Sequence, residues 1–359
     1  MDSSTTATIY INGRFLTQAI TGVQRFAIEL TRTLKAKGIE LNVVCPQNVL
    51  HKDLFQEFDA IVVGHRHGHA WEQIHLVPYL KKRGNPLLLN LCNTAPIRYS
   101  KNIVCIHDLA FLHHPEWFKP LFKRYYNFLL PRIAKKSLAI WTVSKTVKKE
   151  INAYYHIPID NIHVLYNGVS ELFLSKQKPK DSEGNPRPYL LAIGGSNPRK
   201  NNVKLIEALD YLDEHAFDLR IVGRAESNFQ KDQLEEKKRN YQIHFHEDIT
   251  DQLLLSLYQN ASALIYLSKY EGFGIPPLEA LHQGCPLLLS DIPIFRELYE
   301  GLADFVDPER PEQINDFIQG LKAGKIQVPN SDVIKEKTKE FSYSAAAENA
   351  IHAIQKLNY

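Results

Sequence analysis

The sequence predicts an α/β protein with two doubly wound, Rossmann-like domains that face each other across a cleft. Three observations lead to this prediction. The chain has 359 residues, which is too long for one typical domain. Short apolar runs of strand length alternate with amphipathic segments, as in a parallel sheet covered by helices on both faces. The alternation occurs twice, on either side of a charged, proline-containing stretch at residues 175–188 that is typical of a linker.

In the first half, apolar runs predict seven strands, and the spacing of apolar residues over 22–38 predicts a helix after the first of them. These strands are expected at residues 8–11, 40–45, 60–63, 86–91, 102–106, 138–143 and 162–166. The expected N-terminal domain spans residues 1–174.

The second half repeats the pattern and predicts a domain over residues 175–341. Its expected strands lie at 189–195, 218–223, 243–246, 263–268, 286–290 and 304–308. Its expected helices lie at 202–212, 230–240, 251–261 and 277–284. An alanine-rich segment within 342–359 predicts a last helix, which could pack back on the N-terminal domain.

Composition narrows the class of protein. Residues 1–174 hold 21 Lys and Arg against 12 Asp and Glu, whereas residues 175–359 hold 22 against 28. The basic half suggests an anionic partner such as a phospholipid surface, a lipid-linked phosphate or nucleic acid, and a chance surface composition is the alternative. No apolar run approaches the ~20 residues of a membrane span, and the N-terminus does not resemble a secretion signal, so a cytoplasmic protein is expected.

The four cysteines lie inside apolar runs and form no metal-binding or disulfide pattern. Cys45, Cys92, Cys105 and Cys285 are therefore expected to be buried thiols in a reducing compartment.

Ligands of doubly wound sheets bind at the carboxyl ends of the strands, so the strand-to-helix junctions are the candidate sites. The most informative junction is "LSKYEGFGIPPLEALHQG", residues 267–284. Gly272 and Gly274 would allow close approach to a diphosphate at a helix start, and Glu271 and Glu279 could accept hydroxyl hydrogen bonds from a sugar or ribose. A tight turn followed by a helix-start glutamate is the purely structural alternative.

Three other junctions carry polar residues. In "AIGGSNPRKNN", Arg199 and Lys200 precede a helix and could bind phosphate, although they could also decorate an exposed loop. Gly22 begins a predicted helix that carries Arg25 one turn later. His107 and Asp108 follow an apolar strand, and a structural histidine is the alternative there.

Two further segments have competing explanations. The histidines of "HRHGHAWEQIH" lack the neighbouring carboxylates of a metal site, which favours an acceptor loop or solvated histidines. Residues 115–137 mix aromatic residues with six Lys and Arg, which suits either a membrane surface or a helix with a basic solvent face. No recognised nucleic-acid module is present.

Together these strings resemble the retaining glycosyltransferases of family 4, which have the GT-B fold. The matching strings include "TGVQRFAIEL", "WEQIHLVPYL", "CIHDLAFLHHPEWF", "LYNGV", "AIGGSNPRKN" and "YEGFGIPPLEALHQG", in family order along nearly the whole chain. Two glutamates with seven residues between them, Glu271 and Glu279, are the most specific feature. One departure is that Ser196 and Asn197 stand where many members carry a basic residue. The "NPRKN" and "WEQ" variant resembles bacterial enzymes of O-antigen, capsule and exopolysaccharide assembly, among which mannosyltransferases are frequent.

The resemblance implies roles for individual residues. The donor-binding set would be Gly22, Arg199, Lys200, Gly272, Phe273, Gly274, Ile275 and Glu279, with Glu279 on the ribose and Arg199 and Lys200 on the diphosphate. The catalytic set would be His107, Glu271 and Lys200. Arg25 and Asp108 would bind the acceptor. The N-terminal domain would be the acceptor domain and the C-terminal domain the nucleotide-sugar domain.

The implied activity is transfer of a hexose, with mannose ranked first, from a GDP- or UDP-sugar to a lipid-linked or oligosaccharide acceptor. No metal or other cofactor is expected, and no DxD sequence occurs in the chain. The basic N-terminal domain could contact the cytoplasmic face of the inner membrane. A catalytically silent sugar-nucleotide-binding subunit and a GT-B epimerase or phosphorylase are the alternatives.

Overall fold

The computed structural model describes residues 8–175, 187–211, 216–224 and 239–357. The chain forms two compact units, Met1–Gly168 with Glu340–Tyr359, and Val169–Lys339. Most of the predicted linker at 175–188 and of the predicted helix at 230–240 lies outside the described residues. Each unit is built on one sheet whose described pairings are all parallel, so the predicted pair of doubly wound sheets is confirmed.

The sheet of the first unit has the strand order β3-β2-β1-β4-β5-β6-β7. Its strands are β1 (Ile9–Asn12), β2 (Leu41–Cys45), β3 (Ile61–Val62), β4 (Leu87–Asn90), β5 (Asn102–Cys105), β6 (Ala139–Thr142) and β7 (Ile162–Val164). The order reverses between β1 and β4, which pair in parallel with Ile9 opposite Leu87. The carboxyl ends of these two strands therefore form the topological switch point of this unit.

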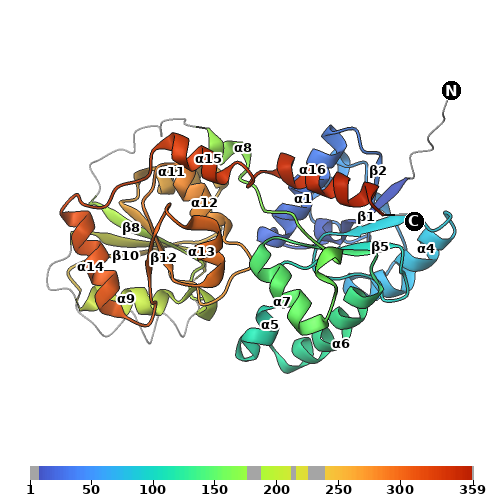
Figure 1. The fold of residues 1–359 in the computed structure, drawn as a ribbon, viewed down its shortest axis with the longest axis horizontal. Coiled ribbons are helices and arrows are strands. Elements are labelled where there is room, and N and C mark those ends of the chain that lie inside the picture. Colours follow the sequence, from blue (N-terminus) through green and yellow to red (C-terminus); the bar gives the residue numbers. More distant parts are fainter. Residues whose placement is uncertain (1–7, 176–186, 212–215, 225–238, 358–359) are drawn as a thin grey trace. The chain divides into compact units, whose positions relative to one another are not determined.

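Helices cover this sheet, and the last helix of the chain belongs to the same unit. They are α1 (Gly22–Ala36), α2 (Lys52–Glu57), α3 (Gly68–Trp71), α4 (Val77–Lys81), α5 (Ala110–His113), α6 (Pro120–Lys136), α7 (Lys145–Tyr155) and α16 (Tyr343–Gln355). The first helix begins with a capping box in which Gln24 Oε1 accepts from the Thr21 backbone N–H at 3.2 Å. Helix α16 lies beside α1, and Lys37 Nζ pairs with Glu348 Oε1 at 2.8 Å (Figure 1).

The sheet of the second unit has the order β10-β9-β8-β11-β12-β13. Its strands are β8 (Tyr189–Ile193), β9 (Asp218–Val222), β10 (Ile243–His246), β11 (Ala263–Tyr266), β12 (Leu287–Ser290) and β13 (Asp304–Val306). Counted within the unit, this is the order 3-2-1-4-5-6 of dinucleotide-binding sheets. The switch point lies between β8 and β11, which pair through Ala263 and Leu190.

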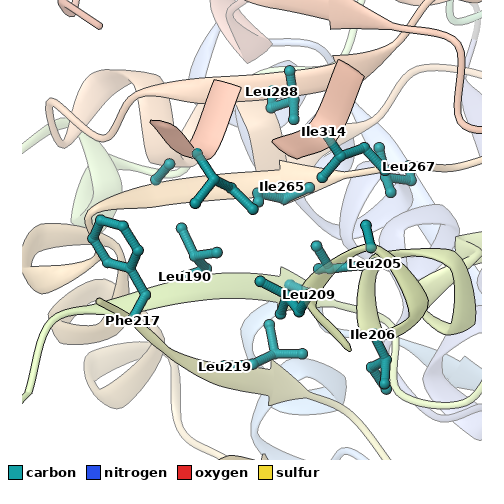
Figure 2. Close-up of a cluster of buried hydrophobic side chains, with 14 of the residues drawn as sticks. Leu190, Leu205, Ile206, Leu209, Phe217, Leu219, Ile265, Leu267, Leu288 and Ile314 are labelled. Atoms are coloured by element: carbon teal, nitrogen blue, oxygen red, sulfur yellow. The ribbon is translucent and has the colours of Figure 1, made fainter. Parts of the chain in front are cut away.

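Helices accompany this sheet, and two of them, Glu171–Leu174 and Ser331–Thr338, pack against the helix Ile275–His282. The described helices of the second unit are α8 (Glu171–Leu174), α9 (Asn202–Asp210), α11 (Asp251–Asn260), α12 (Ile275–His282), α13 (Pro293–Tyr299), α14 (Pro311–Lys322) and α15 (Ser331–Thr338). Figure 2 shows one core cluster, in which strand residues such as Leu190 and Ile265 pack with Leu209 of α9 and Ile314 of α14. This core fixes the strand ends from which the site loops emerge.

The N-terminal segment of the first unit ends at Gly168, whereas the sequence places the domain boundary after residue 174. The short helix α8 lies between these two positions and packs against α12. Gln283 donates to the backbone carbonyls of Phe173 and Ser175, which holds α8 on the second unit.

Three of the four cysteines are buried, as expected, but Cys92 is partly exposed. That expectation was wrong because Cys92 lies beyond the end of β4, in a loop at the edge of the sheet. Burial raises the pKa of the Cys45 thiol to about 11. Across the described ranges, no three or more His, Cys, Asp or Glu residues are grouped to hold a metal ion. No helix in the same ranges is long and apolar enough to cross a membrane.

Candidate active site

Two loops meet at the switch point of the second unit. Arg199 and Lys200 lie in the loop after β8, and Glu271 lies in the loop after β11. The backbone N–H of Lys269 donates to the carbonyl of Arg199 at 2.9 Å, which joins the two loops. Glu271 therefore lies beside Lys200 and Arg199, which are 71 and 72 positions earlier in the sequence, because β8 and β11 are neighbouring strands.

The loop after β8 needs its glycines. Gly194 has a φ of +112°, and a Cβ atom there would lie 2.3 Å from Lys200 Cγ. The Asn202 side chain donates to the Gly195 carbonyl at 2.8 Å, and Asn197 Oδ1 accepts from the Arg199 N–H at 3.0 Å. The loop therefore folds tightly over the stem of Lys200 and directs both basic side chains toward Glu271.

The carboxylate of Glu271 is bound by both cations. Lys200 Nζ lies 2.5 Å from Glu271 Oε1, and Arg199 Nη1 donates to Oε2 at 2.8 Å. Tyr266 on β11 contacts the same lysine through its hydroxyl, and Lys200 Nζ lies 4.4 Å from the centre of the Tyr266 ring. The side chain of Glu271 is 7% exposed and that of Arg199 is 26% exposed. Arg199 is therefore the cation that a ligand reaches most easily.

The charge state of Glu271 follows from these partners. Burial alone would raise the pKa of Glu271, but the charges of Lys200 and Arg199 outweigh it and lower the pKa to about 2. Glu271 is therefore ionised at neutral pH. The cluster of Arg199, Lys200 and Glu271 carries one net positive charge, which suits an anionic ligand.

The second glutamate of the motif has a different partner. Glu279 lies in α12 and is 5% exposed, and the Tyr258 hydroxyl donates to its Oε2 at 3.0 Å. Burial and the nearby Glu279 carboxylate raise the pKa of Tyr258 well above its usual range, so the phenol stays protonated as a donor. Tyr258 therefore fixes one oxygen of a carboxylate that the sequence assigns to ribose.

Helix α13 contacts the glycine loop that precedes α12. Gly274 has a φ of +92°, and a Cβ atom there would lie 2.8 Å from Phe295 Cε1. The Tyr299 hydroxyl donates to the Gly274 carbonyl at 2.6 Å. Gly272 and Phe273 are also buried, and Ile275 begins α12. This support fixes the backbone that would face a phosphate or sugar.

In the first unit, the predicted His107 lies just past β5 and is 5% exposed. Its Nε2–H donates to the Leu91 carbonyl at 2.8 Å, and its ring packs edge-on against Phe26 with centroids 5.0 Å apart. Burial lowers the pKa of His107, which favours the neutral imidazole. Asp108 is partly exposed and its Oδ1 accepts from the Ala110 N–H at 3.1 Å.

The other two predicted residues of this unit lie at the start of α1. Gly22 is the first residue of the helix and is exposed, and Arg25 is partly exposed one turn later. The structure thus distributes the predicted residues between two sheet edges. It joins Arg199, Lys200 and Glu271 directly, and places Glu279 on the adjoining helix.

Sequence reasoning missed a buried polar cluster in the first unit. Glu72 is 1% exposed and lies 3.3 Å from Arg14 Nε and 3.1 Å from His69 Nδ1. The expectation that the histidines near residue 69 lack a neighbouring carboxylate was therefore wrong for His69. The signal in the sequence was the helical spacing of His69 and Glu72, three residues apart, which places them on one side of a turn.

Two doubly wound parallel sheets, one with a cationic cluster and a second buried glutamate at its switch point, define a two-unit protein of the GT-B fold class. Comparison with known proteins gives the family. Residues 175–341 match the family described as Glycosyl transferases group 1, and residues 20–171 match Glycosyltransferase Family 4. The chain therefore belongs to the group 1, family 4 glycosyltransferases.

Several relatives are bacterial enzymes. The O-antigen chain mannosyltransferase RfbU of Salmonella typhimurium is 30% identical over 245 residues, which cover 68% of this chain and 67% of RfbU. The serotype-specific mannosyltransferase WbdA of Escherichia coli is 27% identical over 232 residues, 58% of this chain but only 28% of WbdA. The structure of HepE from Anabaena in complex with UDP-glucose superposes with a TM-score of 0.74 at 15% identity, covering 98% of this chain and 99% of HepE, which shows a shared fold.

Proposed function

We propose that the protein transfers a hexose, with mannose as the first candidate, from a GDP- or UDP-sugar to a lipid-linked or oligosaccharide acceptor. The acceptor would be an intermediate of a bacterial surface polysaccharide such as O-antigen, capsule or exopolysaccharide. The choice of mannose is supported by RfbU and WbdA, both named mannosyltransferases. The choice of a nucleotide sugar is supported by HepE, whose structure holds UDP-glucose.

The cationic cluster at the second unit's switch point is the observation that carries this proposal. Two cations meet one buried, ionised carboxylate, so these three groups together carry one positive charge, which would favour the diphosphate of the donor. Arg199 and Lys200 would stabilise the charge that grows on the leaving nucleoside diphosphate. This electrostatic role can be filled without a metal ion.

The other residues would orient the donor. Glu279, fixed by Tyr258, would accept hydrogen bonds from the two ribose hydroxyls. Glu271 and the backbone of Phe273 to Ile275 would bind the sugar and the phosphate next to it. Gly22 would lie near the diphosphate, and the neutral His107 would line the sugar.

In the proposed step, the bond between the anomeric carbon and the diphosphate oxygen breaks. An acceptor hydroxyl oxygen bonds to the same carbon from the same face, so the α configuration is retained. The departing diphosphate takes the hydroxyl proton. Arg25 and Asp108 would bind the acceptor in the first unit, where both are partly exposed.

A membrane contact through α6 would suit a lipid-linked acceptor. Leu121 is 80% exposed and Phe128 is 50% exposed on this helix, among Lys123, Arg124 and Arg132. Exposed apolar side chains beside basic ones favour binding to an anionic lipid surface. Co-sedimentation with phosphatidylglycerol vesicles, but not with phosphatidylcholine vesicles, is expected, and Leu121→Asp with Phe128→Asp should abolish it.

The activity test uses purified full-length protein, a panel of nucleotide sugars and a lipid-linked oligosaccharide fraction from bacterial membranes. We expect one donor, GDP-mannose first, to release nucleoside diphosphate only when the acceptor is present, with or without EDTA. The anomeric proton–carbon coupling in the NMR spectrum of the product should report an α linkage. Absence of release with every donor would favour the silent subunit, and release without acceptor would favour an epimerase.

A further inference from the structure

A second group of charged residues lies at the switch point of the first unit, between β1 and β4. Arg14 follows β1 in the 3₁₀ turn Gly13–Thr17, and Thr94 lies in the loop after β4. Glu72 reaches them from a π-helical turn, Glu72–Leu76, that follows α3. Single π-helical turns occur frequently at functional sites, and switch points are where doubly wound sheets bind ligands.

Glu72 is the centre of this group. Its carboxylate accepts from Asn12 Nδ2 at 2.8 Å and from Thr94 Oγ1 at 3.1 Å, and it pairs with Arg14 Nε at 3.3 Å. Arg14 also donates to Thr94 Oγ1 at 2.8 Å, and its side chain is only 7% exposed. A buried ion pair of this kind adds little net stability compared with apolar packing, so its presence calls for another explanation.

The ion pair fixes a histidine at the surface. His69 Nδ1 lies 2.9 Å from Arg14 Nη1 and 3.1 Å from Glu72 Oε2, while the His69 side chain remains 33% exposed. Arg14 Nη1 also lies 3.3 Å from His69 Nε2, so Arg14 contacts both ring nitrogens. The oppositely charged Arg14 and Glu72 contribute no net charge of their own, and the exposed part of the imidazole offers a polar contact for a hydroxyl group.

Aromatic rings from α6 stand beside this histidine. The centre of the Tyr125 ring lies 4.9 Å from the centre of the His69 ring, and the centre of the Tyr126 ring lies 6.1 Å from it. Both tyrosines are partly exposed. A fixed polar group next to an aromatic surface matches an uncharged pyranose, which has hydroxyl groups and an apolar ring face.

We infer that His69, Tyr125 and Tyr126 form a subsite for an uncharged pyranose of the acceptor, with Arg14 and Glu72 as positioning residues that hold His69. The inference rests on the proposed function, because it assigns part of the acceptor to this surface. An acceptor hydroxyl bonds to His69, and a face of the pyranose ring packs on Tyr125, because the Tyr126 ring is itself stacked on Phe122 with centroids 4.0 Å apart. The Arg14–Glu72 pair contributes no net charge, so the subsite is assigned to an uncharged sugar of the acceptor rather than to its anionic part.

The test measures binding of three probes to full-length protein by saturation-transfer NMR. The probes are methyl α-D-mannopyranoside, methyl α-D-galactopyranoside and methyl N-acetyl-β-D-glucosaminide, each added in the presence of GDP or UDP. The variants are His69→Ala and Tyr125→Ala. His67→Ala is the matched control, because His67 is exposed two residues away and bonds to Asn48 instead.

We expect at least one pyranoside to bind the wild type, and its affinity to fall about tenfold or more in both variants but not in the control. Unchanged melting temperatures would show that each variant is folded. Binding that is equal in the wild type and both variants would overturn the inference. So would the absence of pyranoside binding in a wild type that is still stabilised by nucleotide, an outcome that leaves the donor site, and with it the proposed function, intact.

Discussion

Lys200 Nζ lies 2.5 Å from Glu271 Oε1, and the two residues follow neighbouring strands, β8 and β11, at the point where the strand order reverses. Arg199 occupies the other oxygen of the same carboxylate. A nucleoside diphosphate that enters this site would meet two cations already fixed in place by Glu271. The cluster is thus preorganised for anion binding, since the cations need no large rearrangement when the ligand arrives.

Removing the positive charge of Lys200 should impair both binding of the donor and transfer of its sugar. For Lys200→Met, we expect kcat/KM for the donor to fall on the order of 100-fold, because the variant loses one of the two groups that would stabilise the leaving diphosphate. Lys204→Met is the matched control, since Lys204 pairs with Glu207 on the partly exposed side of α9. Steady-state kinetics measures both, and equal values for the two variants would contradict the role of Lys200.

The pairing of Glu271 should appear in the pH dependence of stability. Its pKa is lowered from 4.5 to about 2 in the folded protein, so the carboxylate stabilises the fold above pH 4.5 and this contribution is lost as the pH falls toward 2. The full contribution is on the order of 3 kcal/mol. Urea unfolding from pH 7 to pH 3.5 should show the wild type losing its advantage over Glu271→Gln below about pH 4.5.

The control for this experiment is Glu207→Gln, a change on the surface of α9. Its difference from the wild type should stay small across the same pH range. If the difference between wild type and Glu271→Gln instead grew as the pH fell, Glu271 could not be the ionised partner of Lys200.

Any side chain at Gly274 should destabilise the protein and weaken donor binding. A Cβ atom there would combine a left-handed backbone with a 2.8 Å contact to Phe295. Gly284→Ala provides the comparison, because Gly284 has a φ of +76° but open space around its Cβ position. Calorimetry should show a loss of roughly 1–2 kcal/mol for Gly284→Ala, from backbone strain alone. Gly274→Ala should lose more and should also bind the donor more weakly, and equal effects would refute the proposed contact.

Tyr258 should act on donor affinity rather than on the chemical step. Tyr258→Phe removes the hydrogen bond to Glu279, which would bind ribose far from the reacting carbon. We expect KM for the donor to rise about three- to tenfold, a loss of about 1 kcal/mol, with little change in kcat. Tyr189→Phe serves as control, because this buried phenol bonds to the Leu257 carbonyl. A fall in kcat with unchanged KM would contradict this assignment.

Much of this architecture is predictable from the sequence because buried parallel strands are continuous apolar runs. "YLLAIGG" and "SALIYLS" mark β8 and β11, and the glycines and prolines after them mark the turns. Since adjacent parallel strands end at the same edge of a sheet, the sequence predicts that the loops carrying Arg199, Lys200 and Glu271 lie at one edge.

Residues within strands and helices could not be assigned to the site in this way. Tyr266 and Tyr258 have the apolar neighbours of ordinary core residues, and only the fold shows that their hydroxyls reach Lys200 and Glu279. Arg14 and Glu72 are 58 residues apart, and their pairing depends on a π-helical turn that no sequence period indicates. Buried polar contacts between distant segments are set by tertiary packing.

The most direct test of the central claim is thermal stabilisation by UDP-, GDP-, dTDP- and ADP-sugars, measured with the wild type, Lys200→Ala, Glu279→Ala and the control Lys204→Ala. A ligand that binds only the folded state raises stability by RT ln(1 + [L]/Kd). The proposed site predicts that one nucleotide stabilises the wild type and the control, and that both site variants lose the shift. If no nucleotide stabilises the wild type, or if the site variants respond as the wild type does, the donor site is not at the switch point of the second unit.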